Sequence, residues 1–193
     1  MAKIQVVFHS TYGHVWQLAD QVAAGAREVE GSSVLLHQVP ETIPEETLRA
    51  IGAWDARQQF AHIPVADPEQ LADADAIIVG TPTRFGNMSS QMRAFWDGTV
   101  QLWMRGALIG KIGSAFVATG SQHGGHETTI TSIWNTFCHQ GMLICGIPYS
   151  EQRLVTMSEI TGSSPYGAGT MRGVDGSRLM AATKGSFRAS RPS

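Results

Sequence analysis

The sequence predicts an α/β domain built on a doubly wound, mostly parallel sheet. Short apolar segments of strand character alternate with segments of helical periodicity, and three of the strands open directly into loops of small and polar residues. A chain of 193 residues is the size of one ordinary domain. Five strands that alternate with helices imply right-handed crossovers and helices on both faces of the sheet. The expected strands are 3–8, 34–39, 76–80, 114–119 and 142–147.

The N-terminal third begins as strand, loop and helix. Residues 3–8 are rich in β-branched side chains, and apolar residues then recur at helical spacing from Val15 until Gly31 ends the pattern. After the second strand, residues 40–68 are rich in Glu, Pro, Ala and Gln, so we expect a surface excursion with one short helix at 45–50. The residues of this excursion give little indication of a catalytic or binding role.

The second half repeats the alternation. A short helix is expected to end at 71–75, and residues 76–80 are uniformly apolar, as in a parallel strand buried on both faces. Helices at 91–97 and 126–139 then alternate with the last two expected strands. Beyond Pro148 the chain is rich in Gly, Ser and Pro.

The composition excludes several classes of partner. The net charge is only −2, from 14 basic and 16 acidic residues, so no long-range field favours nucleic acid or an anionic membrane. The N-terminus lacks a signal-like apolar run, and no segment approaches the ~20 residues needed to span a bilayer. We therefore expect a cytoplasmic protein, with Cys138 and Cys145 as reduced core residues rather than a disulfide.

The first of three notable loops follows the first strand. Residues 10–15 place two adjacent hydroxyls, Ser10 and Thr11, and a glycine just before a helix N-terminus, where free amides can bind an anion. Neither a Gly-Lys-Ser/Thr sequence nor Gly-x-Gly-x-x-Gly is present, so a phosphate monoester fits better than a triphosphate or dinucleotide. The alternative is an ordinary turn capped by Ser10 or Thr11.

The other two loops follow the third and fourth strands, and in a sheet of order 2-1-3-4-5 they meet the first loop at the ligand-binding edge. Residues 81–85 combine a rigid turn with Arg84 and Phe85, which suits a flat heteroaromatic ligand; the alternative is a solvated arginine and a loop anchor. Glycines in residues 119–125 allow backbone to approach a planar ring. The alternative is a flexible connection.

Two other kinds of site are disfavoured. The spacing of His123, His126 and Glu127 lacks the i, i+4 geometry of a helical zinc pair and has no second ligand cluster, so no metal is expected. The Gly-x-Ser-x-Gly elbow of serine hydrolases is absent as well.

Several motifs of the chain carry a family resemblance. The most specific is Gly80-Thr81-Pro82-Thr83-Arg84-Phe85-Gly86-Asn87-Met88, and the others are Ser10-Thr11-Tyr12-Gly13-His14, Gly106-Ala107-Leu108, Gly141-Met142, Pro165-Tyr166-Gly167 and Asp175-Gly176-Ser177-Arg178. In these motifs, and along the sequence to about Arg178, the chain resembles the flavodoxin-like NAD(P)H:quinone oxidoreductases known as tryptophan-repressor-binding proteins, the WrbA family.

The resemblance implies an FMN cofactor and assigns residues to its site. Ser10, Thr11, Tyr12, Gly13, His14 and Val15 would hold the phosphate, Thr83, Arg84 and Phe85 would lie along the isoalloxazine ring, and Ala118, Thr119, Gly120, Ser121, Gln122 and His123 would surround its polar edge. His139 matches a flavin-site histidine, Trp103 a substrate-site aromatic, and Tyr12 a position that contacts the nicotinamide nucleotide. The alternatives are a helix C-terminal cap for His139 and a core or interface residue for Trp103. The loop 120–125 departs from the family pattern and is one residue longer.

The implied activity is two-electron reduction of quinones by NADH or NADPH, in alternating half-reactions at one flavin face, by a homo-oligomer, either a dimer or a tetramer. The alternatives are a flavodoxin-type electron carrier, disfavoured by the nearly neutral charge, and a regulatory protein-binding flavoprotein. Relatives continue into an acidic final helix, whereas residues 179–193 contain no acidic residue. We therefore expect a domain of residues 1–178 that lacks the usual final helix, followed by an atypical, disordered tail at 179–193.

Overall fold

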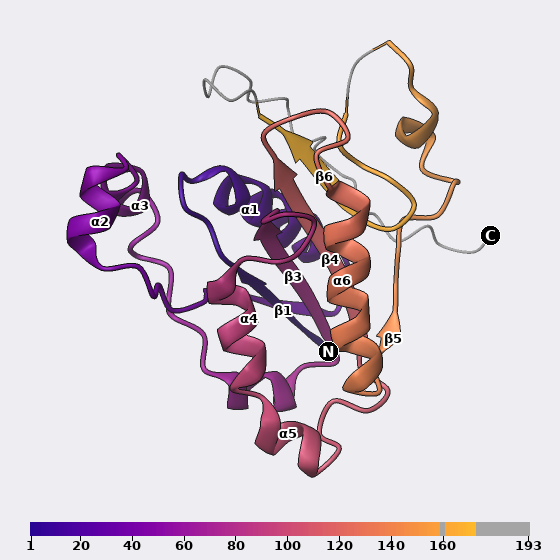
Figure 1. Ribbon diagram of the computed structural model, residues 1–193. Coiled ribbons are helices and arrows are strands. Elements are labelled where there is room, and N and C mark those ends of the chain that lie inside the picture. Colours follow the sequence, from indigo (N-terminus) through magenta and orange to yellow (C-terminus); the bar gives the residue numbers. More distant parts are fainter. Residues whose placement is uncertain (159–160, 173–193) are drawn as a thin grey trace.

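The computed structural model describes residues 1–158 and 161–172 of the chain (Figure 1). The fold is a parallel sheet of order β2-β1-β3-β4-β5, with β6 also paired to β4. The strands are β1 (Ala2–Phe8), β2 (Ser32–Gln38), β3 (Ala76–Pro82), β4 (Ile112–Thr119), β5 (Leu143–Ile144) and β6 (Ala168–Met171). The predicted class and strand order are therefore confirmed.

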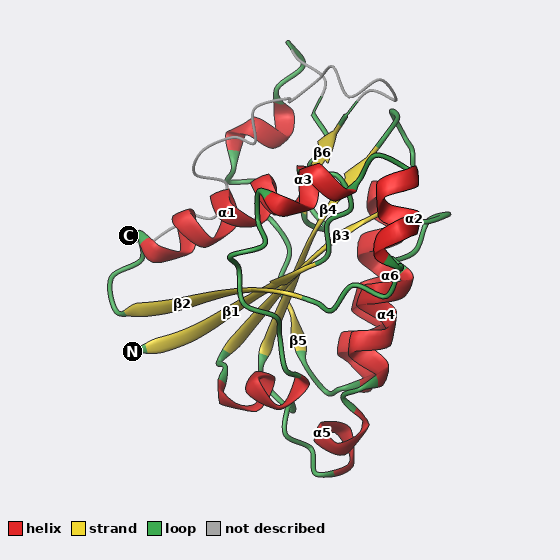
Figure 2. Cartoon of the chain, turned by 90° about the vertical axis from the view of Figure 1, so that its left-hand side faces the viewer, coloured by secondary structure: helices red, strands yellow, loops and turns green. Residues whose placement is uncertain are grey.

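Helices cover both faces of the sheet (Figure 2). On one face α1 packs on β1, β3 and β4 through residues such as Leu18 and Val22, with Phe60 and Ile147 completing the cluster. On the other face α4, α5 and α6 contribute Met92, Leu102 and Ile133 to a separate core. The helices are α1 (His14–Arg27), α2 (Glu45–Ala50), α3 (Trp54–Gln58), α4 (Ser90–Asp97), α5 (Val100–Met104) and α6 (His126–His139), with 3₁₀ turns at Pro68–Asp73 and Gln152–Val155.

The fifth strand differs from the sequence prediction. Only Leu143–Ile144 pairs with the start of β4, and β6 pairs with the end of β4, at Phe116–Thr119. The chain leaves the β4 ladder after Cys145, because the amide of Ile147 donates to Pro165 O (2.9 Å) and Pro148, which has no amide hydrogen, turns the chain away. The outer strand is thus made of two pieces, and the fifth strand predicted at 142–147 is present but shorter, at Leu143–Ile144.

The two cysteines were also misplaced by the sequence analysis. Both are free thiols, as expected, but both are exposed. Cys138 lies on the outward side of α6, next to the core residue Phe137, and Cys145 lies on the outer edge of the sheet after β5. Phe137, the neighbour of Cys138, points into the core, whereas Leu143 and Ile144, which precede Cys145, are exposed on the edge strand.

Two further differences concern short elements. The excursion after β2 holds a second short helix, α3, and the turn before β3 is a 3₁₀ helix that begins with an Asp67 capping box and Pro68. No helix within the described ranges has both the length and the apolar character needed to cross a bilayer. The expected absence of a final helix concerns residues outside those described.

Candidate flavin site at the carboxyl edge of the sheet

The three loops singled out in the sequence lie together where β1, β3 and β4 end. The guanidinium of Arg84 donates from Nη2 to Thr11 Oγ1 (3.1 Å), which joins the second loop to the first. Thr129 on α6 donates to Thr83 Oγ1 (2.8 Å), which joins the second loop to the helix that follows the third. A Cβ added to Gly125 would lie 3.3 Å from the Cα of Gly86, so these two loops pack backbone to backbone.

The first loop has the features of an anion site. The first hydrogen bond of α1 is donated by Gln17 to Gly13 O (3.0 Å), and no residue of the described chain accepts a hydrogen bond from the backbone amides of residues 10–16. Ser10 is 2% exposed, yet its Oγ has no hydrogen-bond partner within the described residues. Gly13, with φ 88°, is the N-cap residue. The alternative of a turn capped by Ser10 or Thr11 is therefore wrong, and the loop's donors are available to a bound anion.

The second loop presents an aromatic ring to solvent. Arg84 and Asn87 exchange two backbone hydrogen bonds (2.8 and 3.1 Å), and this tight turn holds Phe85 at φ 54°. The Phe85 side chain is fully exposed, whereas Met88 at the end of the loop is buried in the core. A positive φ is uncommon for a bulky residue, and such strain gathers at ligand sites. The exposure of Phe85 contradicts the alternative of a loop anchor, whereas the exposed side chain of Arg84 agrees with the alternative of a solvated arginine.

The third loop is shaped by hydrogen bonds among its own residues. Thr119 Oγ1 donates to Ser121 O (2.8 Å), and the amide of Gly124 donates to the same carbonyl (3.3 Å). His123 has φ 51°. A cavity of about 350 Å³ lies beside this loop, between Gln122, the start of α6 and the segment 161–164. The loop thus combines tight backbone turns with an adjacent cavity.

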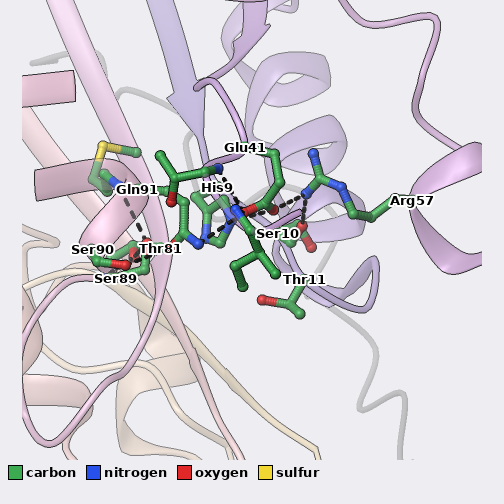
Figure 3. A network of polar contacts seen from close by, with 12 residues as sticks. His9, Ser10, Thr11, Glu41, Arg57, Thr81, Ser89, Ser90 and Gln91 are labelled. Carbon is green, nitrogen blue, oxygen red and sulfur yellow. Dashed lines mark hydrogen bonds and ion pairs between the residues drawn. The ribbon is translucent and has the colours of Figure 1, made fainter. Parts of the chain in front are cut away.

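A polar network of His9, Glu41, Arg57 and Gln91 supports the first loop through a hydrogen bond to Ser10 O (Figure 3). Glu41 Oε2 lies 3.2 Å from Nε2 of His9 and 2.8 Å from Nη1 of Arg57, which also donates to Ser10 O (2.8 Å). Glu41 Oε1 accepts from Nε2 of Gln91 on α4 (2.8 Å) and from the amides of residues 42 and 43 (3.0 Å each). One carboxylate therefore links the residue that follows β1, the excursion after β2, and α4.

The charges of this network follow from the balance between burial and the contacts among its members. Burial alone would raise the pKa of Glu41, but the hydrogen bond from His9, the amide of Ile43 and the positive charge of Arg57 outweigh that effect and lower the pKa to about 2. Burial lowers the pKa of His9, against the opposing effect of Glu41. At neutral pH the network therefore consists of a carboxylate, a guanidinium and a neutral imidazole that donates from Nε2.

Sequence reasoning missed three charged residues near the first loop. Glu41 and Arg57 lie in the excursion that seemed to carry little chemistry, and neither belongs to a motif. Arg172 follows β6, and its Nη1 hydrogen-bonds Nδ1 of His14, the first residue of α1. Burial and the charge of Arg172 lower the pKa of His14 to about 4. Each of these residues is far in sequence from its partner near the first loop; Arg172 and His14, for example, are 158 residues apart. No local sequence pattern could therefore reveal them.

The remaining candidate residues occupy two different places. Tyr12 lies in the first loop, half exposed, and its hydroxyl donates to Ile51 O in the excursion (3.3 Å). Trp103 is 57% exposed on α5, and His139 is exposed at the C-terminal end of α6. Figure 1 shows α5 and that end of α6 at the opposite end of the sheet from the three loops. Within one chain, Trp103 and His139 are therefore far from the loops.

Comparison with known proteins agrees with this geometry. The model of the family described as NADPH-dependent FMN reductase matches residues 7–149. The chain belongs to this family. The resemblance to flavodoxin-like quinone oxidoreductases is confirmed, since relatives that carry the name NAD(P)H dehydrogenase (quinone) are similar over most of both chains. The protein of Trichlorobacter lovleyi is 61% identical over 92% of this chain and 87% of its own, and that of Aromatoleum aromaticum is 56% identical over 94% and 88%.

Solved structures support the fold of this FMN reductase family member. The WrbA-like flavodoxin from Agrobacterium tumefaciens is 28% identical, covers 74% of this chain and 76% of its own, and superposes with a TM-score of 0.54. A flavodoxin from the domain Archaea, 20% identical with a TM-score of 0.55 over 89% of this chain and 84% of its own, shares the fold.

The residues present fit FMN. A phosphate monoester needs several donors at one point, and the amides of residues 10–16 and the orphaned Ser10 hydroxyl supply them. A planar ring needs an apolar partner, and the exposed ring of Phe85 is available at the same edge. The site therefore combines an anion-binding end with an aromatic end.

Proposed function

We propose that this protein is an FMN-dependent NAD(P)H:quinone oxidoreductase. The observation that carries the proposal is the meeting of a donor-rich phosphate loop with an exposed aromatic ring at one edge of the sheet, in a chain whose relatives at 53–61% identity are named for this reaction. FMN, when bound, accepts two electrons from NAD(P)H and passes them to a quinone. An electron-carrier role is disfavoured by the net charge of −2.

The chain's own residues would bind and orient rather than react covalently. Residues 10–15 would hold the phosphate, Thr83, Arg84 and Phe85 would lie along the ring, and residues 118–123 would face its polar edge with their amides. The guanidinium of Arg84 would stabilise negative charge that develops at the cofactor. Support comes from its exposed position beside Thr11.

Tyr12 would contact the nicotinamide nucleotide. Tyr12 is 46% exposed. It belongs to the first loop, and its hydroxyl donates a hydrogen bond to Ile51 O in the excursion. An exposed aromatic ring at this place offers a stacking surface to a ligand that enters and leaves. The quinone would then occupy the same face after the nucleotide departs.

Trp103 and His139 would reach a flavin site only across a subunit boundary, so we propose a homo-oligomer in which a second copy supplies them. Large apolar side chains are exposed on and next to α5 and β5, which is unusual for a monomer surface: Val100 (51%), Trp103 (57%), Met104 (69%), Ile109 (70%) and Leu143 (61%). A dimer or tetramer in analytical ultracentrifugation supports this arrangement, and a monomer at micromolar concentration contradicts it. The two free, exposed cysteines suit the reducing cytoplasm, where we place the protein.

The experiment that tests the function uses purified protein reconstituted with FMN. We expect a flavin absorption spectrum after gel filtration and oxidation of NADH or NADPH that depends on added benzoquinone. Reconstituted protein that retains FMN but does not oxidise either nucleotide in the presence of benzoquinone would overturn the proposal.

A further inference from the structure

The guanidinium of Arg57 holds a backbone carbonyl of the first loop. Arg57 belongs to α3 in the excursion after β2, and its Nη1 donates to Ser10 O (2.8 Å). The same nitrogen lies 2.8 Å from Glu41 Oε2, and the guanidinium carbon lies 5.4 Å from the ring centre of Phe60, a fully buried residue. With these contacts, and with a side chain only 12% exposed, Arg57 is fixed in place on the side of the loop where the polar network lies (Figure 3).

The contact with Ser10 O sets the direction of the next backbone amide. A trans peptide unit is planar, and its carbonyl oxygen and amide hydrogen point in opposite directions. No peptide bond within the described ranges is cis. Because the carbonyl of Ser10 points towards Arg57, the amide of Thr11 points away from the network. That amide donates to no acceptor in the described part of the chain.

An independent observation indicates what kind of ligand this amide meets. The Ser10 hydroxyl, in a residue only 2% exposed, has no partner within the described residues, and a buried hydroxyl without a partner is costly unless a ligand completes it. An anion at the loop would accept from this hydroxyl and from the free amides together. A Ser10–Thr11 peptide turned the other way would present the carbonyl oxygen, an acceptor, to that anion. The direction of this one peptide therefore affects how well the loop binds a phosphate.

The excursion contacts the first loop at a second point as well. The hydroxyl of Tyr12 donates to Ile51 O (3.3 Å), between α2 and α3. Ser10 and Tyr12, on either side of Thr11, are thus both bonded to the excursion. The conformation of the loop around Thr11 consequently depends on a segment some 40 residues further along the chain.

We infer that Arg57 is a positioning residue of the cofactor site, which holds the Ser10–Thr11 peptide in the direction that presents the Thr11 amide to the FMN phosphate. The inference rests on the proposed function. Arg57 acts through the backbone, because its guanidinium lies on the opposite side of this peptide from the amide. The excursion thereby contributes to the preference for FMN over riboflavin, which differs from FMN only in lacking the phosphate.

The test compares the dissociation constants of FMN and riboflavin, measured by quenching of flavin fluorescence on titration with apoprotein. Arg57→Met keeps the length of the side chain but removes its donors, so FMN binding should weaken at least about tenfold and riboflavin binding less than about twofold. Arg57→Lys should recover part of the loss, since an ammonium group can donate to the same carbonyl. Arg49→Met is the matched control, because Arg49 lies on α2 of the same excursion and is 56% exposed, and it should leave both constants unchanged.

A double variant separates the direction of the peptide from simple charge. Arg57→Met leaves the carboxylate of Glu41 without its counter-ion, and this negative charge could by itself repel a phosphate at the first loop. Glu41→Gln combined with Arg57→Met removes both charges of the pair. If Arg57 acts by holding the peptide, the double variant should bind FMN as weakly as Arg57→Met does.

Three results would overturn the inference. Equal weakening of FMN and riboflavin binding in Arg57→Met would show that Arg57 only stabilises the fold around the loop. Unchanged binding of both flavins would remove it from the site. Recovery of wild-type FMN binding in the double variant would show that Arg57 acts only by neutralising Glu41. Failure of the wild-type protein to bind FMN would instead refute the proposed function itself, and the two failures are thereby distinguishable.

Discussion

The carboxylate of Glu41 offers a sharp test of how the site is supported. Glu41→Gln keeps the size of the side chain but removes its charge, and an amide NH₂ group replaces one of the two acceptor oxygens. Those oxygens accept from His9, Arg57 and Gln91 and from two backbone amides. The variant therefore leaves Arg57 without its counter-ion. It also places the new amide NH₂ group, a hydrogen-bond donor, opposite groups that donate to Glu41 in the wild type.

The structure sets the size of the expected effect. The side chains of Glu41 and Arg57 are each 12% exposed, so the pair is only weakly screened by solvent. A folded-state pKa of about 2, against 4.5 for an ordinary glutamate, corresponds to at most about 3.4 kcal/mol. Loss of one partner of a buried pair costs about 3–5 kcal/mol. Allowing for the partial exposure, we expect Glu41→Gln to lower the free energy of unfolding by about 2–3 kcal/mol at pH 7.

Urea denaturation of the apoprotein, followed by circular dichroism, measures this loss. Glu45→Gln is the matched control, because it breaks an ion pair with Arg49 in which both side chains are more than half exposed. This variant should lower the free energy of unfolding by less than about 0.5 kcal/mol. Because the folded pKa of Glu41 is depressed, its contribution is complete above pH 4.5 and disappears as the pH falls towards 2. The difference between wild type and Glu41→Gln should shrink in the same range. Equal losses in the two variants, or a difference independent of pH, would refute the reasoning.

Three other outcomes follow from the structure. Arg84→Ala should weaken FMN binding by about 1.5–3 kcal/mol without changing the fold, because the side chain is exposed; unchanged affinity and unchanged flavin reduction would exclude it from the site. Trp103→Ala should alter the KM for quinone and nucleotide more than the Kd for FMN in stopped-flow and titration experiments, and identical kinetics would favour a purely structural role. Gly80→Ala should destabilise the apoprotein by about 1–3 kcal/mol in urea, because the new Cβ would lie 2.1 Å from Cζ of Phe116; wild-type stability would show that the ring can move aside.

The sequence by itself determined the class of fold and the meeting of the three candidate loops at one edge of the sheet. Alternating apolar and helical periodicity is a local property, and the five predicted strand regions and the two long helices correspond to observed elements. The site loops were predictable for the same reason: each one directly follows a strand, and the carboxyl ends of parallel strands must meet at one edge. The motif around Arg84 and Phe85 then indicated the ligand class from a few adjacent residues.

Tertiary structure decided what depends on contacts between distant segments. The outer strand is split because β5 pairs with the start of β4 and β6 pairs with its end. Residues 142–147 alone do not show that a later segment takes the second position. The exposure of Cys138 depends on which side of α6 faces the sheet. Glu41 has its low pKa, and Arg172 its place beside His14, only because folding brings together residues that no short motif connects. Periodicity specifies the elements locally, whereas burial and electrostatics are created when those elements pack.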